Sequence, residues 1–227
     1  METNVARYID HAVLKPEMSR EEAKKAILEG VKFSVRTVCV RPCDIDLAVD
    51  LCKGSQTEVS CTLGFPHGDG MTEVKAYEAS LYVKKGITEI DMVANYGYIR
   101  SGLWDLVLSD IKAVADITKQ AGVLLKVIFE TCTLSDEEIK KTTEICIEAG
   151  ADFVKTSTGF HNKGATDEAV KAMIEAAKGR IKVKASGGIR DLETAKKYLD
   201  FGCERLGVGY STTPVLVSGE GQSKEAY

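Results

Sequence analysis

The chain has 227 residues, 44% of them hydrophobic and 28% charged, which is the ordinary composition of a globular protein. A formal net charge of −4 disfavours binding to nucleic acid or to an anionic membrane, so any anionic ligand must be held locally. The seven cysteines show neither the spacing of a metal site nor that of a disulfide framework. With no long apolar run and no secretion signal, the sequence predicts a protein of the reducing cytoplasm.

Short strand-like runs alternate with amphipathic stretches along the chain. The pattern predicts strands near residues 7–14, 35–40, 58–63, 87–93, 123–129, 152–156, 181–185 and 205–208. It predicts helices at Arg20–Gly30, Asp44–Lys53, Thr72–Lys85, Leu103–Ala121, Ser135–Ala149, Thr166–Lys178 and Asp191–Phe201. Each helix is expected to end at a glycine that begins the turn into the next strand, at Gly30, Gly54, Gly86, Gly122, Gly150, Gly179 and Gly202.

This repeat of about 30 residues matches the length of a βα unit. We therefore expect one α/β domain, a (β/α)₈ TIM barrel over residues 1–218, with a flexible polar tail over 219–227. The alternative is an open doubly wound sheet. It is disfavoured because no G-x-G-x-x-G follows the first strand.

Charged residues interrupt several of the most strand-like runs. Lys126, Lys155 and Lys184 each lie in an apolar run, as does Asp91. Lysine is seldom buried without a partner, and an amine that loses its proton becomes a nucleophile. The lysines could simply form internal ion pairs with Glu89, Asp91 or Glu130. Because Lys155 and Lys184 lie near the ends of consecutive strands, where barrel active sites form, we instead predict Schiff-base chemistry, with Lys126 as a supporting charge. Lys182, two residues deeper, is expected to be structural.

Glycine-bearing loops follow these strands and predict a phosphate site. Backbone N–H groups of glycines can face an anion, and barrels commonly hold phosphate in the loops after strands 7 and 8. The expected substrate-binding and phosphate-binding residues are Thr158, Gly159, Gly187, Gly188, Gly207 and Gly209.

The motifs in this order resemble those of the deoxyribose-phosphate aldolase family. The resemblance extends from Tyr8 to Gly207 and is most specific in two blocks, Val154-Lys155-Thr156-Ser157-Thr158-Gly159-Phe160 and Lys184-Ala185-Ser186-Gly187-Gly188-Ile189-Arg190. Further matching segments are Ile9-Asp10-His11, Thr62 to Gly68, Glu89 to Val93 and Leu124 to Ile128. Gly209-Tyr210 departs from the family, many of whose members have two serines in the last phosphate loop.

The resemblance implies an aldolase that splits 2-deoxy-D-ribose 5-phosphate into D-glyceraldehyde 3-phosphate and acetaldehyde, in deoxyribose phosphate catabolism. The resemblance also implies that the enzyme needs neither a metal nor a cofactor. Lys155 would form the Schiff base, Lys184 would lower its pKa, and Asp91 would relay protons. Tyr227 and Lys126 are possible further proton relays, whereas His11 and His67 are expected to be structural. The expected partners are a phosphosugar, small aldehydes and further copies of the chain in a dimer or tetramer.

Two rival functions stay open at this point. One is a different Schiff-base aldolase that acts on another phosphosugar or on a keto acid. The other is a catalytically silent barrel that only binds a phosphosugar. The joint presence of Lys155, Lys184 and Asp91 argues against the second, because binding alone needs no covalent amine.

Overall fold

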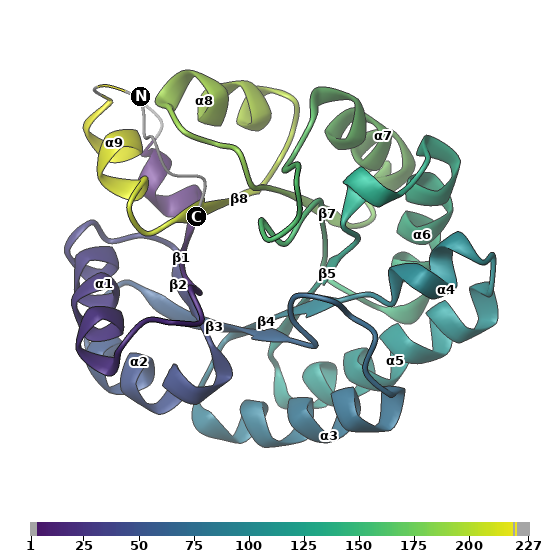
Figure 1. Cartoon of the computed structure of the whole chain (residues 1–227), viewed down its shortest axis with the longest axis horizontal. Coiled ribbons are helices and arrows are strands. Elements are labelled where there is room, and N and C mark those ends of the chain that lie inside the picture. Colours follow the sequence, from purple (N-terminus) through teal and green to yellow (C-terminus); the bar gives the residue numbers. More distant parts are fainter. Residues whose placement is uncertain (1–3, 220, 222–227) are drawn as a thin grey trace.

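Eight parallel strands form a closed barrel in sequence order, as the computed structural model shows for residues 4–219 and 221 (Figure 1). The strands are β1 (Ile9–Val13), β2 (Thr37–Val40), β3 (Glu58–Leu63), β4 (Glu89–Val93), β5 (Leu124–Ile128), β6 (Phe153–Lys155), β7 (Lys182–Ser186) and β8 (Arg205–Gly209). Strand β8 pairs with β1, which closes the sheet and leaves no open edge. The TIM barrel prediction is confirmed, and the doubly wound alternative is excluded.

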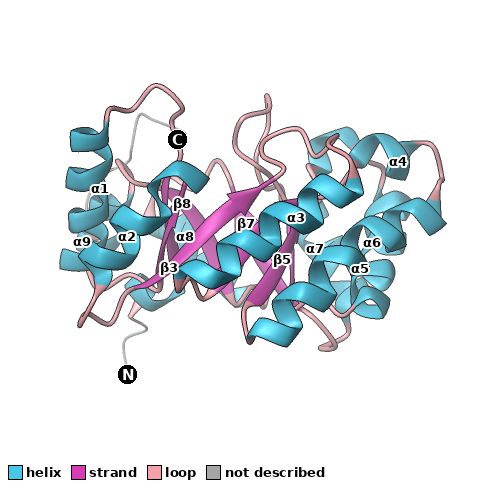
Figure 2. Cartoon of the chain, turned by 90° about the horizontal axis from the view of Figure 1, so that it is seen from below, coloured by secondary structure: helices cyan, strands magenta, loops and turns pink. Residues whose placement is uncertain are grey.

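Helices surround the barrel on its outside (Figure 2). They are α1 (Arg20–Lys32), α2 (Ile45–Cys52), α3 (Thr72–Tyr82), α4 (Tyr96–Arg100), α5 (Trp104–Ala121), α6 (Asp136–Ala149), α7 (Asp167–Ala177), α8 (Leu192–Asp200) and α9 (Thr213–Ser218). Short 3₁₀ turns lie at Val5–Tyr8, Pro42–Asp44, Val83–Lys85 and Thr131–Thr133. No helix in the described part of the chain has the length and apolarity needed to cross a membrane.

Local signals explain several helix ends. Ser19 with Glu22, and Ser135 with Glu138, form reciprocal capping boxes at the starts of α1 and α6. Helices α5 and α6 end at the left-handed glycines Gly122 and Gly150, as predicted. The short helices α4 and α9 were not predicted, because five or six residues are too few for a periodic apolar pattern.

Gly30 does not end its helix, which is a correction to the sequence-based boundary. Helix α1 continues to Lys32, and Gly30 lies within it at a close contact with the barrel wall. A Cβ atom on Gly30 would lie 2.7 Å from Val38 Cγ1 and 3.0 Å from His11 Cδ2. The glycine is therefore explained by helix–strand packing rather than by a turn.

The predicted boundary at residue 218 coincides with the end of α9 at Ser218. Most of the predicted tail, including Tyr227, lies outside the described residues.

Candidate active site

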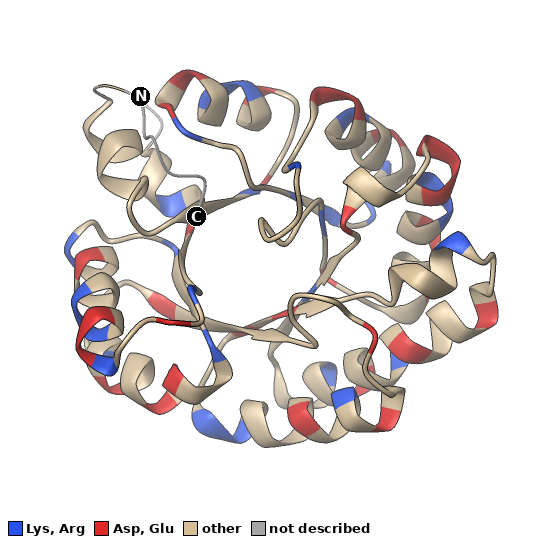
Figure 3. Cartoon of the chain, viewed as in Figure 1, with Lys and Arg blue, Asp and Glu red and all other residues tan. Residues whose placement is uncertain are grey.

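Branched apolar side chains fill the interior of most such barrels. The interior of this barrel is instead charged. Figure 3 shows basic and acidic residues on the strands as well as on the outer helices. In the part of the chain that the structure describes, seven buried ionisable side chains converge within the barrel. They are four cations and three carboxylates, namely Lys126, Lys155, Lys184, Arg205, Asp10, Glu89 and Asp91. If all were ionised, the cluster would carry one excess positive charge.

Strand register explains why these residues meet. Lys155 on β6 is aligned with Lys184 on β7, and Asp91 on β4 is aligned with Lys126 on β5. Alternate side chains of a strand point to the same face, so β4 supplies two inward carboxylates, while β1, β5, β6, β7 and β8 supply one inward charged residue each. The sequence prediction that the two terminal lysines approach each other holds in the structure.

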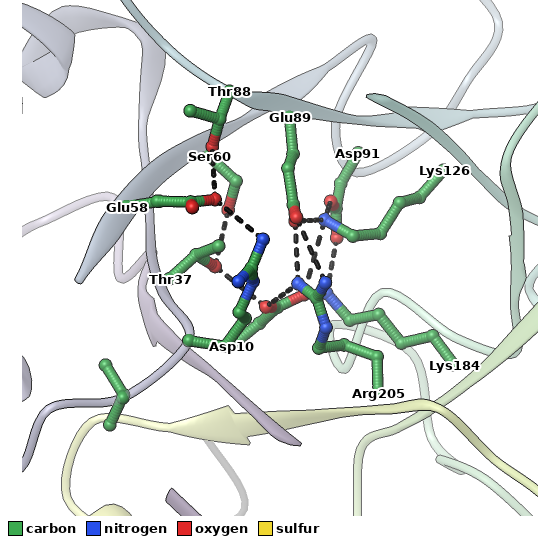
Figure 4. Close-up of polar contacts among 12 residues, drawn as sticks. Asp10, Thr37, Glu58, Ser60, Thr88, Glu89, Asp91, Lys126, Lys184 and Arg205 are labelled. Atoms are coloured by element: carbon green, nitrogen blue, oxygen red, sulfur yellow. Dashed lines mark hydrogen bonds and ion pairs between the residues drawn. The ribbon is translucent and has the colours of Figure 1, made fainter. Parts of the chain in front are cut away.

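Asp91 lies between the three lysines of this cluster. Its Oδ2 atom lies 2.8 Å from Lys155 Nζ and 2.7 Å from Lys184 Nζ, while its Oδ1 atom lies 2.7 Å from Lys126 Nζ (Figure 4 draws Asp91, Lys126 and Lys184). Burial alone would raise the pKa of the Asp91 carboxyl, but the charges of the three lysines outweigh it and hold the pKa well below its ordinary value. Asp91 is therefore an ionised acceptor shared by three amines, two of which contact the same oxygen.

Arg205, Glu89 and Asp10 form a second set of contacts next to these lysines. Arg205 donates to both oxygens of Glu89 at 2.7 and 3.0 Å and to Asp10 Oδ1 at 2.6 Å. The Asp10 Oδ2 atom lies 2.5 Å from Lys184 Nζ. Burial raises the pKa of Asp10, yet Lys126, Lys184 and Arg205 together keep it far below its ordinary value. Sequence reasoning assigned no role to Asp10 or Arg205, because their partners are remote in the chain.

The three lysines differ in how many carboxylates surround them. Lys126 contacts three, with Glu89 at 2.5 Å, Asp91 at 2.7 Å and Asp10 at 3.3 Å. Burial lowers the pKa of Lys126, but these carboxylates raise it well above its ordinary value, so Lys126 keeps its proton.

Lys184 contacts two carboxylates, whereas Asp91 is the only carboxylate that Lys155 contacts among the described residues. Lys155 is thus the lysine that loses least ion pairing when it becomes a neutral amine. Lys182 lies outside this cluster, half-exposed at the amino end of β7 and 3.8 Å from Glu204.

The loops after β6 and β7 pack against each other through glycines. A Cβ on Gly164 would lie 2.3 Å from the carbonyl of Gly187, and one on Gly187 would lie 3.6 Å from the Cα of Gly159. Gly159, Gly187 and Gly188 all have positive φ angles. The loops after β6 and β7 therefore depend on glycine for their close approach.

Three further predicted binding residues have defined places. A Cβ on Gly207 would lie 2.3 Å from Ser186 Oγ and 3.2 Å from Lys184 Cε, so this glycine leaves room for the lysine. Gly209 ends β8, and the following Tyr210 donates its N–H to Ala12. Thr158 donates its hydroxyl and, at 3.3 Å, its N–H to Glu130 Oε2.

That contact was not predicted for Glu130, which the sequence offered only as a possible ion-pair partner of the strand lysines. Glu130 is buried with a left-handed φ of 56°, and it joins the loop after β5 to the loop that follows Lys155. A positive φ at a non-glycine residue is uncommon, but such a torsion angle cannot be read from an E-T dipeptide. The Thr158 hydroxyl is occupied in fixing the loop.

Of the two histidines expected to be structural, His11 is buried and hydrogen-bonded, whereas His67 is exposed. His11 is buried, with Nε2 2.9 Å from the Ala26 carbonyl and Nδ1 2.8 Å from Thr213 Oγ1. Burial, opposed by the Ala26 hydrogen bond, lowers the pKa of His11 to about 4. His67 is exposed in the loop after β3.

Comparison with known proteins identifies the family of this chain. Residues 5–211 match the model of the DeoC/LacD family aldolases. The deoxyribose-phosphate aldolase of Caldanaerobacter subterraneus subsp. tengcongensis is 47% identical over 90% of this chain and 89% of its own length. The corresponding protein of Aquifex aeolicus is 46% identical, over 90% and 91%.

Solved structures are similar over the whole barrel. An aldolase called QR15 superposes with a TM-score of 0.89 and 44% identity, covering 95% of both chains. The deoxyribose phosphate aldolase of Aeropyrum pernix, described as a unique tetrameric structure, gives 0.85 and 29% identity, covering 94% of this chain and 90% of its own. This chain is an enzyme of the DeoC/LacD family of aldolases.

Proposed function

We propose that this aldolase reversibly cleaves 2-deoxy-D-ribose 5-phosphate into D-glyceraldehyde 3-phosphate and acetaldehyde. One observation carries the chemical part of the proposal: Lys155 and Lys184 donate to the same Asp91 oxygen within a cluster that holds four cations and three carboxylates. With Lys155 as a free amine, the cluster has three charges of each sign. The relatives named above support the choice of substrate.

The reaction begins at the Lys155 Nζ atom. The free amine adds to the C1 aldehyde of the open-chain sugar, and loss of water gives an iminium. The iminium draws electrons from the C2–C3 bond, which breaks when the C3 hydroxyl loses its proton. The glyceraldehyde phosphate leaves, and C1 and C2 stay on Lys155 as an enamine. Protonation at C2 and hydrolysis then release acetaldehyde and restore the amine.

Asp91 and Lys184 serve this sequence in different ways. Asp91 Oδ2 accepts from both amines, so it is placed to take a proton from one and return it to the other. Lys184 supplies the fixed positive charge that disfavours a second ammonium on Lys155. Lys126 holds Asp91 in its ionised form. Tyr227 stays a candidate proton relay, although it lies outside the described residues.

An apolar wall beside the lysines suits the acetaldehyde part of the substrate. Ala12, Leu14 and Cys39 form a buried cluster on which Phe65 packs. Burial and the nearby charge of Asp91 raise the pKa of the Cys39 thiol, so the wall is uncharged. The phosphate would be held at the glycine loops, by N–H groups of Gly187 and Gly188 and by the turn after Gly209, with Thr158 and Gly159 shaping the neighbouring loop and Gly207 leaving space.

We place the reaction in the cytoplasm, where a phosphorylated sugar is retained, and we propose that the chain works as a homo-oligomer. The tetrameric Aeropyrum pernix relative supports the latter.

Trapping the intermediate tests the proposed function. Borohydride reduction in the presence of acetaldehyde should add an ethyl group to Lys155, read by peptide mass spectrometry. Lys126, equally buried, is the internal control and should stay unlabelled. Labelling at Lys126 or Lys184 with Lys155 untouched would overturn the assignment. Lys155→Leu should abolish turnover while the far-ultraviolet circular dichroism spectrum is unchanged. A panel of phosphosugars and keto acids then separates the proposed substrate from those of other Schiff-base aldolases.

A further inference from the structure

Exposed apolar side chains gather on one side of the barrel. Nine large hydrophobic residues are exposed in the described part of the chain, and six of them lie on or just before two neighbouring helices, α3 and α5. These six are Met71, Val74, Tyr77, Leu81, Leu103 and Leu106. We call them the α3/α5 face. Monomeric proteins seldom concentrate exposed apolar residues in this way, and such patches mark interaction sites.

The helix period places the apolar residues of α3 in one stripe. Val74, Tyr77 and Leu81 have the spacing i, i+3, i+7, with Met71 at the N-cap continuing the row. The inward side of the same helix is held by Lys75, whose buried Nζ atom lies 2.7 Å from Asp110 Oδ2 on α5. This ion pair, with Thr72 donating to Asp110 at 2.9 Å, fixes α3 against α5, so the stripe faces outward beside Leu103 and Leu106. Figure 2 shows the two helices next to each other on the outside of the barrel.

Tyr77 is the largest side chain of this face and lies midway along the stripe. It is 66% exposed, as much as Met71 at 69%. Tyrosine at the centre of an apolar patch is typical of residues that dominate interface energies.

Charges flank the stripe with opposite signs at its two ends. Exposed Glu73 lies in the first turn of α3, and exposed Asp105 lies in the first turn of the parallel helix α5. Exposed Lys84 and Lys85 follow the last turn of α3, where Lys85 also pairs with Asp46 at 2.7 Å. A surface that is acidic at one end and basic at the other is complementary to itself when it is turned by 180°.

We infer that the α3/α5 face is where a second copy of this chain docks, with the two α3 helices antiparallel across a two-fold axis near Tyr77. In that arrangement Val74 lies opposite Leu81 of the second copy, and Glu73 lies opposite its Lys84. The stripe supplies an apolar centre and the charges supply its rim, which is the usual composition of a specific interface. The inference rests on the homo-oligomer proposed above and names its contact surface.

Sedimentation velocity of the full-length protein, over a range of concentrations, tests this surface. The parent should sediment as a dimer or larger assembly, and Tyr77→Glu should weaken its association at least 100-fold, since it places two carboxylates at the axis. Leu28→Glu, at an exposed leucine of α1, is the matched control and should associate like the parent. A parent that stays monomeric up to 100 µM (about the highest concentration to be tested), or a Tyr77→Glu variant that associates normally, would overturn the inference.

Charge reversal tests the antiparallel arrangement separately. Glu73→Lys and Lys84→Glu should each weaken association about tenfold, and the double variant should recover the parent's affinity, because each reversed charge again meets its opposite. Failure of the double variant to recover would exclude the antiparallel contact. Acetaldehyde trapping at Lys155 in every variant reports an intact barrel. Loss of trapping in the parent would count against the proposed function and leave the sedimentation result unaffected.

Discussion

The charged residues inside this barrel are not the ones that would make the fold most stable. Replacing buried ion pairs by well-packed apolar side chains is often neutral or stabilising, whereas removing one partner leaves an uncompensated charge. Asp10, Glu89 and Asp91 are nevertheless fully buried with four cations around them. The proposed chemistry would account for such an interior, because a free amine at Lys155 would require neighbouring cations to be held in place.

Removing Lys184 should shift the pH dependence of the reaction. In Lys184→Leu the three carboxylates face only Lys126, Arg205 and Lys155, so charges balance when Lys155 keeps its proton. The acid limb of the kcat/KM profile should therefore move to higher pH, with the rate at pH 7 falling about tenfold for each unit of displacement. Lys184→Arg retains the cation and should keep the acid limb where the parent has it, whatever its turnover. A leucine variant whose profile overlays that of the parent would show that the charge of Lys184 is not used.

Removing Arg205 should destabilise the fold. Arg205→Met leaves Glu89 without its bidentate partner and Asp10 with one donor fewer, both at buried positions. The expected loss is about 3–5 kcal/mol, measured from the urea unfolding midpoint and its slope. The partly exposed pair of Arg36 and Glu58, 3.0 Å apart, provides the comparison, since Arg36→Met should cost less than about 1 kcal/mol. Equal losses in the two variants would contradict the network as described.

At the scale of elements, the sequence predicts more about existence than about boundaries. Eight strands and their alternating helices follow from periodicity, and the convergence of Lys155 with Lys184 follows from their equal places on consecutive strands. The contact of Glu130 with Thr158 and the role of Arg205 could not be predicted, because they depend on partners that only the folded barrel brings close. Gly30 shows the same limit. Its sequence context resembles a helix end, whereas its contact with Val38 depends on how α1 packs on β2.

The close packing at Gly30 gives a prediction whose sign depends on two opposed effects. Alanine is favoured over glycine within a helix by about 1 kcal/mol. Its methyl group would, however, lie 2.7 Å from Val38 Cγ1 in a buried wall, and such overpacking costs about 1–3 kcal/mol. We expect Gly30→Ala to lower the melting temperature. Val38→Ala together with Gly30→Ala should recover part of that loss, because the small side chain removes the clash. A stabilised single variant would show that α1 shifts away without cost.

For the molecule as a whole, the charged cluster and the buried His11 should lose their contributions to stability in different pH ranges. Asp10 and Asp91 have depressed pKa values, so their stabilising contribution is complete above about pH 4 and is lost only below it. His11 acts at higher pH. Its folded pKa of about 4 lies below the value of 6.5 for a solvated histidine, so between these values the unfolded chain binds a proton that the native state does not. Stability contributed by neutral His11 is therefore present above pH 6.5 and is lost as the pH falls towards 4.

The predicted size of this effect is about 2–3 kcal/mol between pH 6.5 and 4.5, at about 1.4 kcal/mol for each pH unit. Urea unfolding at a series of pH values should show it as a slope that His11→Gln removes, even though the glutamine variant is less stable at neutral pH. His67→Gln, at an exposed histidine, should retain the slope and serves as the control. Ring resonances of His11 in NMR spectra should titrate near pH 4. If His11→Gln keeps the parent's slope, the acid sensitivity arises from other groups. The hydrogen bonds of His11 with Ala26 on α1 and Thr213 on α9 would then not depend on a neutral imidazole.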